Sequence, residues 1–224
     1  MKKGLLNKIK KIKLISIDGD GCLFSYENVG SRFHSSWDAL GFAYGLKDRW
    51  DKRINIFYKK DADDFEWARR DVNDLKGRLV EDSLKILYPV PFCEGAKEFA
   101  EKSKERFVRG VLSTAIDLVV YKSKEELGLD FAFCNVLHRE NGCFTGTHTH
   151  NVPIWRKHEK LPEICKRYGV KLEEICHVGD NENDIYVGRK VGLFIALKPK
   201  KQEVRKLAHY TADDFFDIMR LLKI

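Results

Sequence analysis

The chain has 224 residues, of which 43% are hydrophobic and 33% charged, and its formal net charge is +7. This composition predicts one compact domain, or a core domain with a small insert, and it argues against wholesale disorder. The basic balance favours anionic partners such as phosphorylated metabolites, nucleic acid or acidic membrane surfaces, and it does not choose among them.

The N-terminal segment, residues 1–13, is basic, and its lysines interrupt every apolar run. We therefore expect no signal peptide, and no segment approaches the apolar length that a membrane span requires. A solvated tail or turn of helix is the favoured interpretation, with a nucleic-acid or membrane-surface arm as the alternative. The six cysteines are scattered without a C-x-x-C pair, which favours reduced thiols in a cytoplasmic enzyme.

The first predicted strand, residues 14–17, runs directly into two aspartates, Asp18 and Asp20. Its sequence, L-I-S-I, fits a buried parallel strand. Residues 24–91 then change in character, because they are rich in aromatic and charged side chains and their apolar residues recur at helical spacing. We expect several helices there, which could form a small bundle that covers a site.

After this insert, strands and helices alternate along the chain. We expect helices at 94–104, 116–127 and 157–168, strands at 107–112, 175–178 and 191–197, and a hairpin of 131–137 and 142–144 with Asn-Gly at its turn. Such alternation is typical of an α/β fold with a parallel sheet.

Polar residues stand where the predicted strands end. They are Asp18, Asp20, Ser113, Thr114, Asp180 and Asp184, and Lys157 begins a helix nearby. Ligands of open α/β sheets bind at the carboxyl ends of the strands, so we expect these groups to converge on one crevice. Carboxylates at that density would repel one another unless a divalent cation neutralised them, and all-oxygen ligation favours Mg2+.

A metal ion beside a lysine favours a phosphoryl group as the substrate. Mg2+ and Lys157 would neutralise its oxygens, while Ser113 and backbone N–H groups would donate hydrogen bonds to them. Asp18 could attack phosphorus to form an aspartyl-phosphate, and Asp20 could protonate the leaving oxygen and later activate water. Each residue alone has an ordinary structural explanation, such as a turn, a helix cap or a surface lysine, so the prediction depends on their combination.

Four motifs occur in order: D-G-D-G-C-L at 18–23, Ser113 after an apolar strand, Lys157, and G-D-N-E-N-D at 179–184. Through them the chain resembles the haloacid dehalogenase-like phosphatases, and within that family the phosphoserine phosphatase branch. Further similarity runs through E-L-G-L-D-F-A-F at 126–133 and N-G-C-F-T-G at 141–146. The resemblance covers most of the chain outside the insert.

The resemblance implies a Rossmann-like parallel sheet with helices on both faces. Residues 1–23 and 92–224 would form this core domain, and residues 24–91 would form an inserted helical cap that closes over the substrate. Asp18 would be the nucleophile and Asp20 the acid/base. The remaining assignments are Mg2+ ligation by Asp18, the backbone carbonyl of Asp20 and Asp180, with support from Asp184, and phosphate binding by Ser113, Thr114 and Lys157.

Two positions bear on the substrate. Glu27 stands where the branch keeps a glutamate for the amine of phosphoserine, and Arg70 matches the arginine that binds its carboxylate. Other positions depart from the branch, because Gly21-Cys22 replaces the usual Ser-Thr and Thr114-Ala115 replaces two glycines near the phosphate. Phosphoserine is the leading candidate among small phosphorylated metabolites, and a sugar phosphate or a nucleotide is the alternative.

Two non-catalytic hypotheses compete with this one. A receiver-like module also carries aspartates, a Ser or Thr and a lysine on a parallel sheet, but an acid two residues beyond the nucleophile favours turnover. A binding protein on a phosphatase scaffold could hold nucleic acid through its basic N-terminal segment, and the intact motif set argues against it. The sequence carries no signal for oligomeric state.

Several other side chains attract attention. His148, His150 and His158 suggest a zinc site, but no fourth ligand accompanies them, and a structural role is favoured. The aromatic residues Trp37, Trp50 and Trp67 are expected in the core of the cap rather than on a stacking surface.

Overall fold

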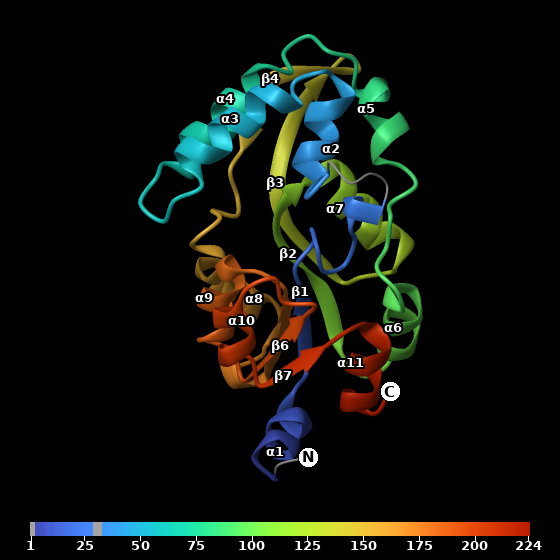
Figure 1. Ribbon diagram of the computed structural model, residues 1–224. Coiled ribbons are helices and arrows are strands. Elements are labelled where there is room, and N and C mark those ends of the chain that lie inside the picture. Colours follow the sequence, from blue (N-terminus) through green and yellow to red (C-terminus); the bar gives the residue numbers. More distant parts are fainter. Residues whose placement is uncertain (1–2, 29–32) are drawn as a thin grey trace.

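The computed structural model describes residues 3–28 and 33–224. These residues form an α/β core beneath a layer of helices, and both ends of the chain lie on the side of the core away from that layer (Figure 1). The predicted α/β class is therefore confirmed.

Seven strands of the described residues form a single sheet in the order β4-β3-β2-β1-β5-β6-β7. They are β1 (Leu14–Ile17), β2 (Val108–Ile116), β3 (Phe131–Glu140), β4 (Cys143–Thr149), β5 (Ile175–Gly179), β6 (Leu193–Leu197) and β7 (Tyr210–Ala212). Neighbouring strands are parallel except β3 and β4, which form the predicted hairpin. Because β1 lies between β2 and β5, the chain extends the sheet first on one side of β1 and later on the other. This change of direction is the switch point at which α/β sheets bind ligands.

Helices cover both faces of the sheet, as the resemblance implies. One face carries α6 (Ala96–Ser103), α7 (Asp117–Glu126) and α11 (Phe215–Leu222), and the other carries α8 (Leu161–Tyr168), α9 (Ile185–Gly188) and α10 (Gln202–Leu207). Side chains of β1 alternate between these layers, because Ile15 and Ile17 pack with the first group and Leu14 packs with the second.

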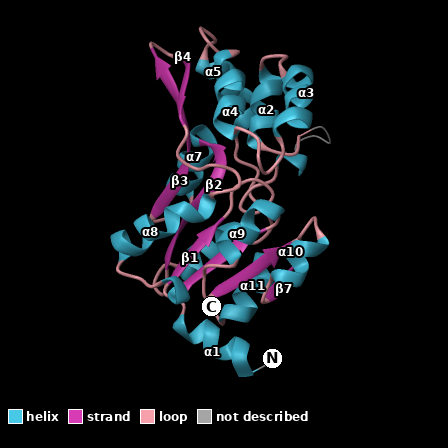
Figure 2. Cartoon of the chain, turned by 90° about the vertical axis from the view of Figure 1, so that its left-hand side faces the viewer, coloured by secondary structure: helices cyan, strands magenta, loops and turns pink. Residues whose placement is uncertain are grey.

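Beyond the carboxyl ends of the strands lies a layer of helices from the predicted insert (Figure 2). It contains α2 (Ser36–Ala43), α3 (Lys47–Phe57), α4 (Asp64–Asn73) and α5 (Val80–Leu87). The β3–β4 hairpin extends from the core into this layer. The backbone N–H of Gly77 donates to the carbonyl of Phe144 at 2.8 Å, and that of Phe144 donates to the carbonyl of Arg78 at 2.9 Å.

Some elements differ from the prediction. β2 continues past Leu112 to Ile116, so that Ser113 and Thr114 lie within the strand, and its pairing with β3 shifts register over these residues. The predicted helix that begins at Lys157 starts with a 3-10 turn before α8. The C-terminal elements α10, β7 and α11 were not predicted. α10 and β7 are too short to show a clear period, whereas α11 is amphipathic and its apolar pattern was overlooked.

The N-terminal segment forms a helix, α1 (Lys3–Lys11), which agrees with the helical form of the favoured interpretation. Its residue Ile9 is buried against the core, so the segment is not a solvated tail. Within the described ranges, every helix falls short of the length and apolar character needed to cross a membrane. All six cysteines are free thiols.

Gly110 of β2 lies opposite Phe131 of β3, and a Cβ atom at Gly110 would come within 2.3 Å of the Phe131 ring. We expect Gly110→Ala to lower the free energy of unfolding by about 1–3 kcal/mol, because an overpacked core must shift its neighbours. Urea unfolding followed by circular dichroism measures the change. The control is Gly4→Ala in α1, where a Cβ would meet no atom within 4 Å. An equal loss in both variants would contradict the packing argument.

Candidate active site

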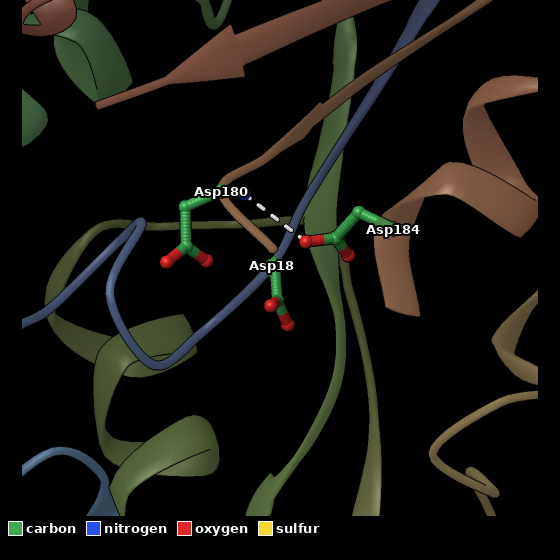
Figure 3. Close-up of side chains that lie close together, drawn as sticks. All are labelled: Asp18, Asp180 and Asp184. Carbon is green, nitrogen blue, oxygen red and sulfur yellow. Dashed lines mark hydrogen bonds between the residues drawn. The ribbon is translucent and has the colours of Figure 1, made fainter. Parts of the chain in front are cut away.

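Three buried aspartates meet at the carboxyl ends of β1 and β5 (Figure 3). Asp18 directly follows β1, Asp180 directly follows β5, and Asp184 ends the 3-10 turn η4 (Glu182–Asp184). Each residue offers one carboxylate oxygen, and these oxygens lie within 4.8 Å of one another. The fold thus brings together carboxylates from both ends of the sequence.

Lys157 is fully buried and lies between two of these carboxylates. Its Nζ is 2.8 Å from Oδ1 of Asp18 and 2.8 Å from Oδ1 of Asp184. The Nε2 atom of His177 lies 3.1 Å from the same Asp184 oxygen, and the backbone N–H of Asp180 donates to the other oxygen at 3.1 Å. Burial opposes the charge of Asp184, but Lys157 and His177 hold the pKa of Asp184 below its ordinary value. Asp184 is therefore ionised, and both its oxygens already have donors.

Neighbouring cations compensate the charge of Asp180 less than that of Asp184. Burial, and then the carboxylates of Asp184 and Asp18, raise the pKa of Asp180 well above its ordinary value. Gly21 permits the loop after β1 to approach it, because Gly21 has φ +79° and a Cβ there would lie 2.6 Å from Oδ2 of Asp180. Buried carboxylate oxygens with too few cations around them are the donors that a hard divalent metal ion prefers. The residues present fit such an ion.

Asp20 lies against the first turn of α2. It accepts hydrogen bonds from the backbone N–H and the hydroxyl of Ser36, at 2.6 and 2.8 Å. Burial raises the pKa of Asp20 to about 7, although these hydrogen bonds oppose the change. A carboxyl group that titrates near neutral pH can donate a proton in one step and accept one in the next.

Ser113 and Thr114 lie in β2 beside the loop that carries the first aspartates. Ser113 is buried, and a Cβ at Gly19 would come within 2.8 Å of its hydroxyl oxygen, so the loop passes directly over it. The carbonyl of Thr114 accepts hydrogen bonds from the indole of Trp37 at 3.0 Å and from the amide of Asn135 at 3.2 Å. The end of β2 therefore connects the aspartate cluster with the helical layer.

A cavity of about 380 Å³ extends from the aspartates to the helices above them. Its floor includes Asp18, Asp20, Ser113, Thr114 and Asp180, and its helical side includes Trp37, Asp38, Trp50, Asp51, Tyr58, Asp64, Trp67 and Asp71. Trp50 is buried in the core of this layer, as expected. All three tryptophans also line the cavity, and Trp37 and Trp67 are only partly buried, so the expected core position holds fully for Trp50 alone.

The two residues suggested for substrate binding are placed differently. Glu27 lies beside the cavity, with its Oε1 atom 3.3 Å from Nζ of Lys200 and 3.2 Å from Nδ1 of His34, and both of these residues line the cavity. Arg70 pairs with Glu66 at 2.7 Å and does not line the cavity. The structure therefore does not bring Arg70 to the other predicted residues.

The histidines have structural contacts. In the part of the chain that the structure describes, the three aspartates are the only group of acidic, histidine and cysteine residues able to hold a metal ion. His150 connects the helices to the core, because its Nε2 lies 3.0 Å from a carboxylate oxygen of Asp64 on α4. The same oxygen accepts a hydrogen bond from the backbone N–H of Ile154 at 2.8 Å.

Two residues of the site escaped the sequence analysis. His177 lies on β5 and contacts Asp184, and its place just before the G-D motif was the available signal. Lys200 lines the cavity from the loop after β6, so the rule that polar residues gather at strand ends applied to it as well.

Comparison with known proteins gives consistent matches. The haloacid dehalogenase-like hydrolase family model matches residues 151–215. A phosphoserine phosphatase of Methanocaldococcus jannaschii is 34% identical over 194 residues, which cover 85% of this chain and 88% of that protein. One of Archaeoglobus fulgidus is 31% identical over 84% of this chain, which spans about half (53%) of that protein's length. A solved phospho-aspartyl intermediate analogue of phosphoserine phosphatase has TM-score 0.77 and 30% identity, covering 93% of this chain and 98% of the other.

Lys157→Met removes the ammonium group that lies between two buried carboxylates. We expect the free energy of unfolding to fall by about 3–5 kcal/mol, because the substitution leaves buried charge without its partner. Urea unfolding in metal-free buffer measures the loss. Lys166→Met, at an exposed position of α8, is the matched control and should change the value by less than about 1 kcal/mol. A loss no larger than that of the control would contradict the role given to Lys157.

Proposed function

The chain belongs to the haloacid dehalogenase-like hydrolases, in their phosphoserine phosphatase branch, and from this membership we propose a Mg2+-dependent phosphomonoesterase that forms an aspartyl-phosphate on Asp18. The observation that carries the proposal is the buried Lys157 ammonium, 2.8 Å from Asp18 and from Asp184, beside the less compensated Asp180. Phosphoserine is the leading substrate candidate, because the relatives just described are phosphoserine phosphatases.

The phosphate group would lie over the floor of the cavity. Lys157 would neutralise its charge, and Ser113 with Thr114 would donate hydrogen bonds from the end of β2. Asp18, Asp180 and the backbone carbonyl of Asp20 would hold Mg2+, while Asp184 would hold Lys157 in place. When bound, the metal ion neutralises phosphoryl oxygens and orients phosphorus toward the nucleophile.

The reaction would have two steps. A carboxylate oxygen of Asp18 attacks phosphorus, and the bond to the leaving oxygen breaks as Asp20 gives that oxygen a proton. Asp20 then takes a proton from water, which attacks the aspartyl-phosphate, releases inorganic phosphate and restores Asp18. The pKa of Asp20, raised by burial to about 7, suits both roles.

We assign residues 24–91 to the cap and residues 1–23 and 92–224 to the core domain. The cap covers the cavity, and its closure would exclude water from the phosphoryl group.

Free thiols at all six cysteines favour the cytoplasm as the location. The substrate would be a small phosphorylated metabolite bound in the cavity, and the basic N-terminal helix lies on the side of the core away from the helical layer (Figure 1).

Asp18→Asn should lower kcat for phosphoserine and for p-nitrophenyl phosphate by at least about 1000-fold, because it removes the nucleophile. Phosphate release in the presence of Mg2+ measures the loss. Asp61→Asn, at an exposed position outside the cavity lining, is the control for the same chemical change. Activity in Asp18→Asn equal to that of the control would remove Asp18 from the mechanism.

Removal of divalent metal with EDTA should abolish activity, and added Mg2+ should restore it.

Asp180→Asn should weaken Mg2+ binding to the metal-free protein by at least about tenfold, because a neutral amide replaces a charged oxygen ligand. Isothermal titration calorimetry measures this affinity independently of turnover, with Asp61→Asn as the control. Wild-type affinity in Asp180→Asn would exclude the proposed ligand set.

A further inference from the structure

The cap side of the cavity is acidic. Asp38, Asp51, Asp64 and Asp71 line it, and no lysine or arginine from the described part of the cap does so. The nearby cations already have carboxylate partners. Lys47 lies 2.7 Å from Asp51 and 3.3 Å from Asp38, and Arg53 lies 2.6 Å from Asp71. These helices therefore offer a carboxylate on the leaving group only aspartates and cations that already have partners.

Lys200 offers a different environment. Across residues 3–28 and 33–224 it is the only lysine or arginine that lines the cavity. Its side chain is 40% exposed, and its Nζ lies 3.3 Å from Glu27 and 3.7 Å from Asp180. The backbone N–H of Lys200 donates to the carbonyl of Asp180 at 3.2 Å, which fixes this loop beside the aspartate cluster.

We propose that Lys200 binds the carboxylate of the leaving group and so performs the role that the resemblance gave to Arg70. This inference rests on the proposed phosphatase function and identifies how the same site recognises an α-amino acid. The adjacent Glu27 carboxylate, to which the resemblance assigned the amine of phosphoserine, would face the ammonium group of the substrate. An acid and a base side by side match the two charges of a zwitterion, and each would exchange its present partner for one group of the substrate.

The exchange is physically inexpensive. Glu27 and Lys200 are 44% and 40% exposed, so their mutual ion pair contributes little to stability. Inside a closed cavity the same charges act on a ligand with less screening by water. The pair therefore favours a zwitterionic leaving group over a neutral alcohol such as glycerol.

The test compares phosphoserine with phosphoethanolamine, which has the same phosphate and amine but no carboxylate. In the Mg2+-loaded enzyme, Lys200→Met should lower kcat/KM for phosphoserine by about 10- to 100-fold, mainly through KM, because a charge-assisted hydrogen bond is lost. The loss for phosphoethanolamine should be at least about tenfold smaller. Lys200→Arg should retain most of the phosphoserine activity.

Lys201→Met is the matched control, since it removes the same charge from the next residue, which does not line the cavity. It should leave both substrates unaffected. Equal losses for both substrates in Lys200→Met would indicate that the lysine acts through Asp180 rather than on the substrate carboxylate, and would overturn the proposal. An unchanged kcat/KM for phosphoserine in Lys200→Met would also overturn it. The same holds if the wild-type enzyme hydrolyses phosphoethanolamine and not phosphoserine. If p-nitrophenyl phosphate is not hydrolysed either, the proposed phosphatase function itself fails.

Discussion

Burial of an ammonium group among carboxylates is the interaction on which the rest of the site depends. Desolvating one charge in a protein interior costs several kcal/mol, and Lys157 is fully buried together with Asp18 and Asp184. Lys157 can stabilise both carboxylates only because β1 and β5 are neighbours in the sheet and the turn after β5 returns Asp184 to their ends. The electrostatics of the site therefore require β1 to lie beside β5, which is the strand order at the switch point of the sheet.

The helical layer contributes to the chemistry as well as covering it. Ser36 at the start of α2 donates two hydrogen bonds to Asp20, so the group assigned as acid and base is held by the cap. The indole of Trp37 reaches the carbonyl of Thr114, and Asp64 on α4 contacts His150 of the core. In the proposed mechanism, water exclusion and proton transfer would therefore depend on the same set of contacts between the helical layer and the core.

Much of this arrangement could be predicted, because local patterns determine it. The run L-I-S-I followed by charge identifies β1, and strand-end residues at 18, 180 and 184 converge as the sheet rule requires. The prediction failed where pairing between distant segments decides the outcome. Nothing local to β3 and β4 indicates their contact with Gly77. Arg70 is a local case instead, because Glu66 stands four residues before it on α4, the spacing at which helical side chains pair, so this contact could have been predicted. Lys200 stands in the run K-P-K-K, which looks like ordinary solvated surface.

The β3–β4 hairpin connects the helical layer to the core at a second place. The chain enters and leaves the cap at adjacent points, since the backbone N–H of Ser25 donates to the carbonyl of Pro91 at 2.9 Å. The hairpin adds a second anchorage at Gly77 and Phe144, remote from the first. Together with the contacts of Ser36, Trp37 and Asp64 to the core, this fastens the helical layer along several separate segments, so that displacing it would break backbone hydrogen bonds of the hairpin as well as side-chain contacts.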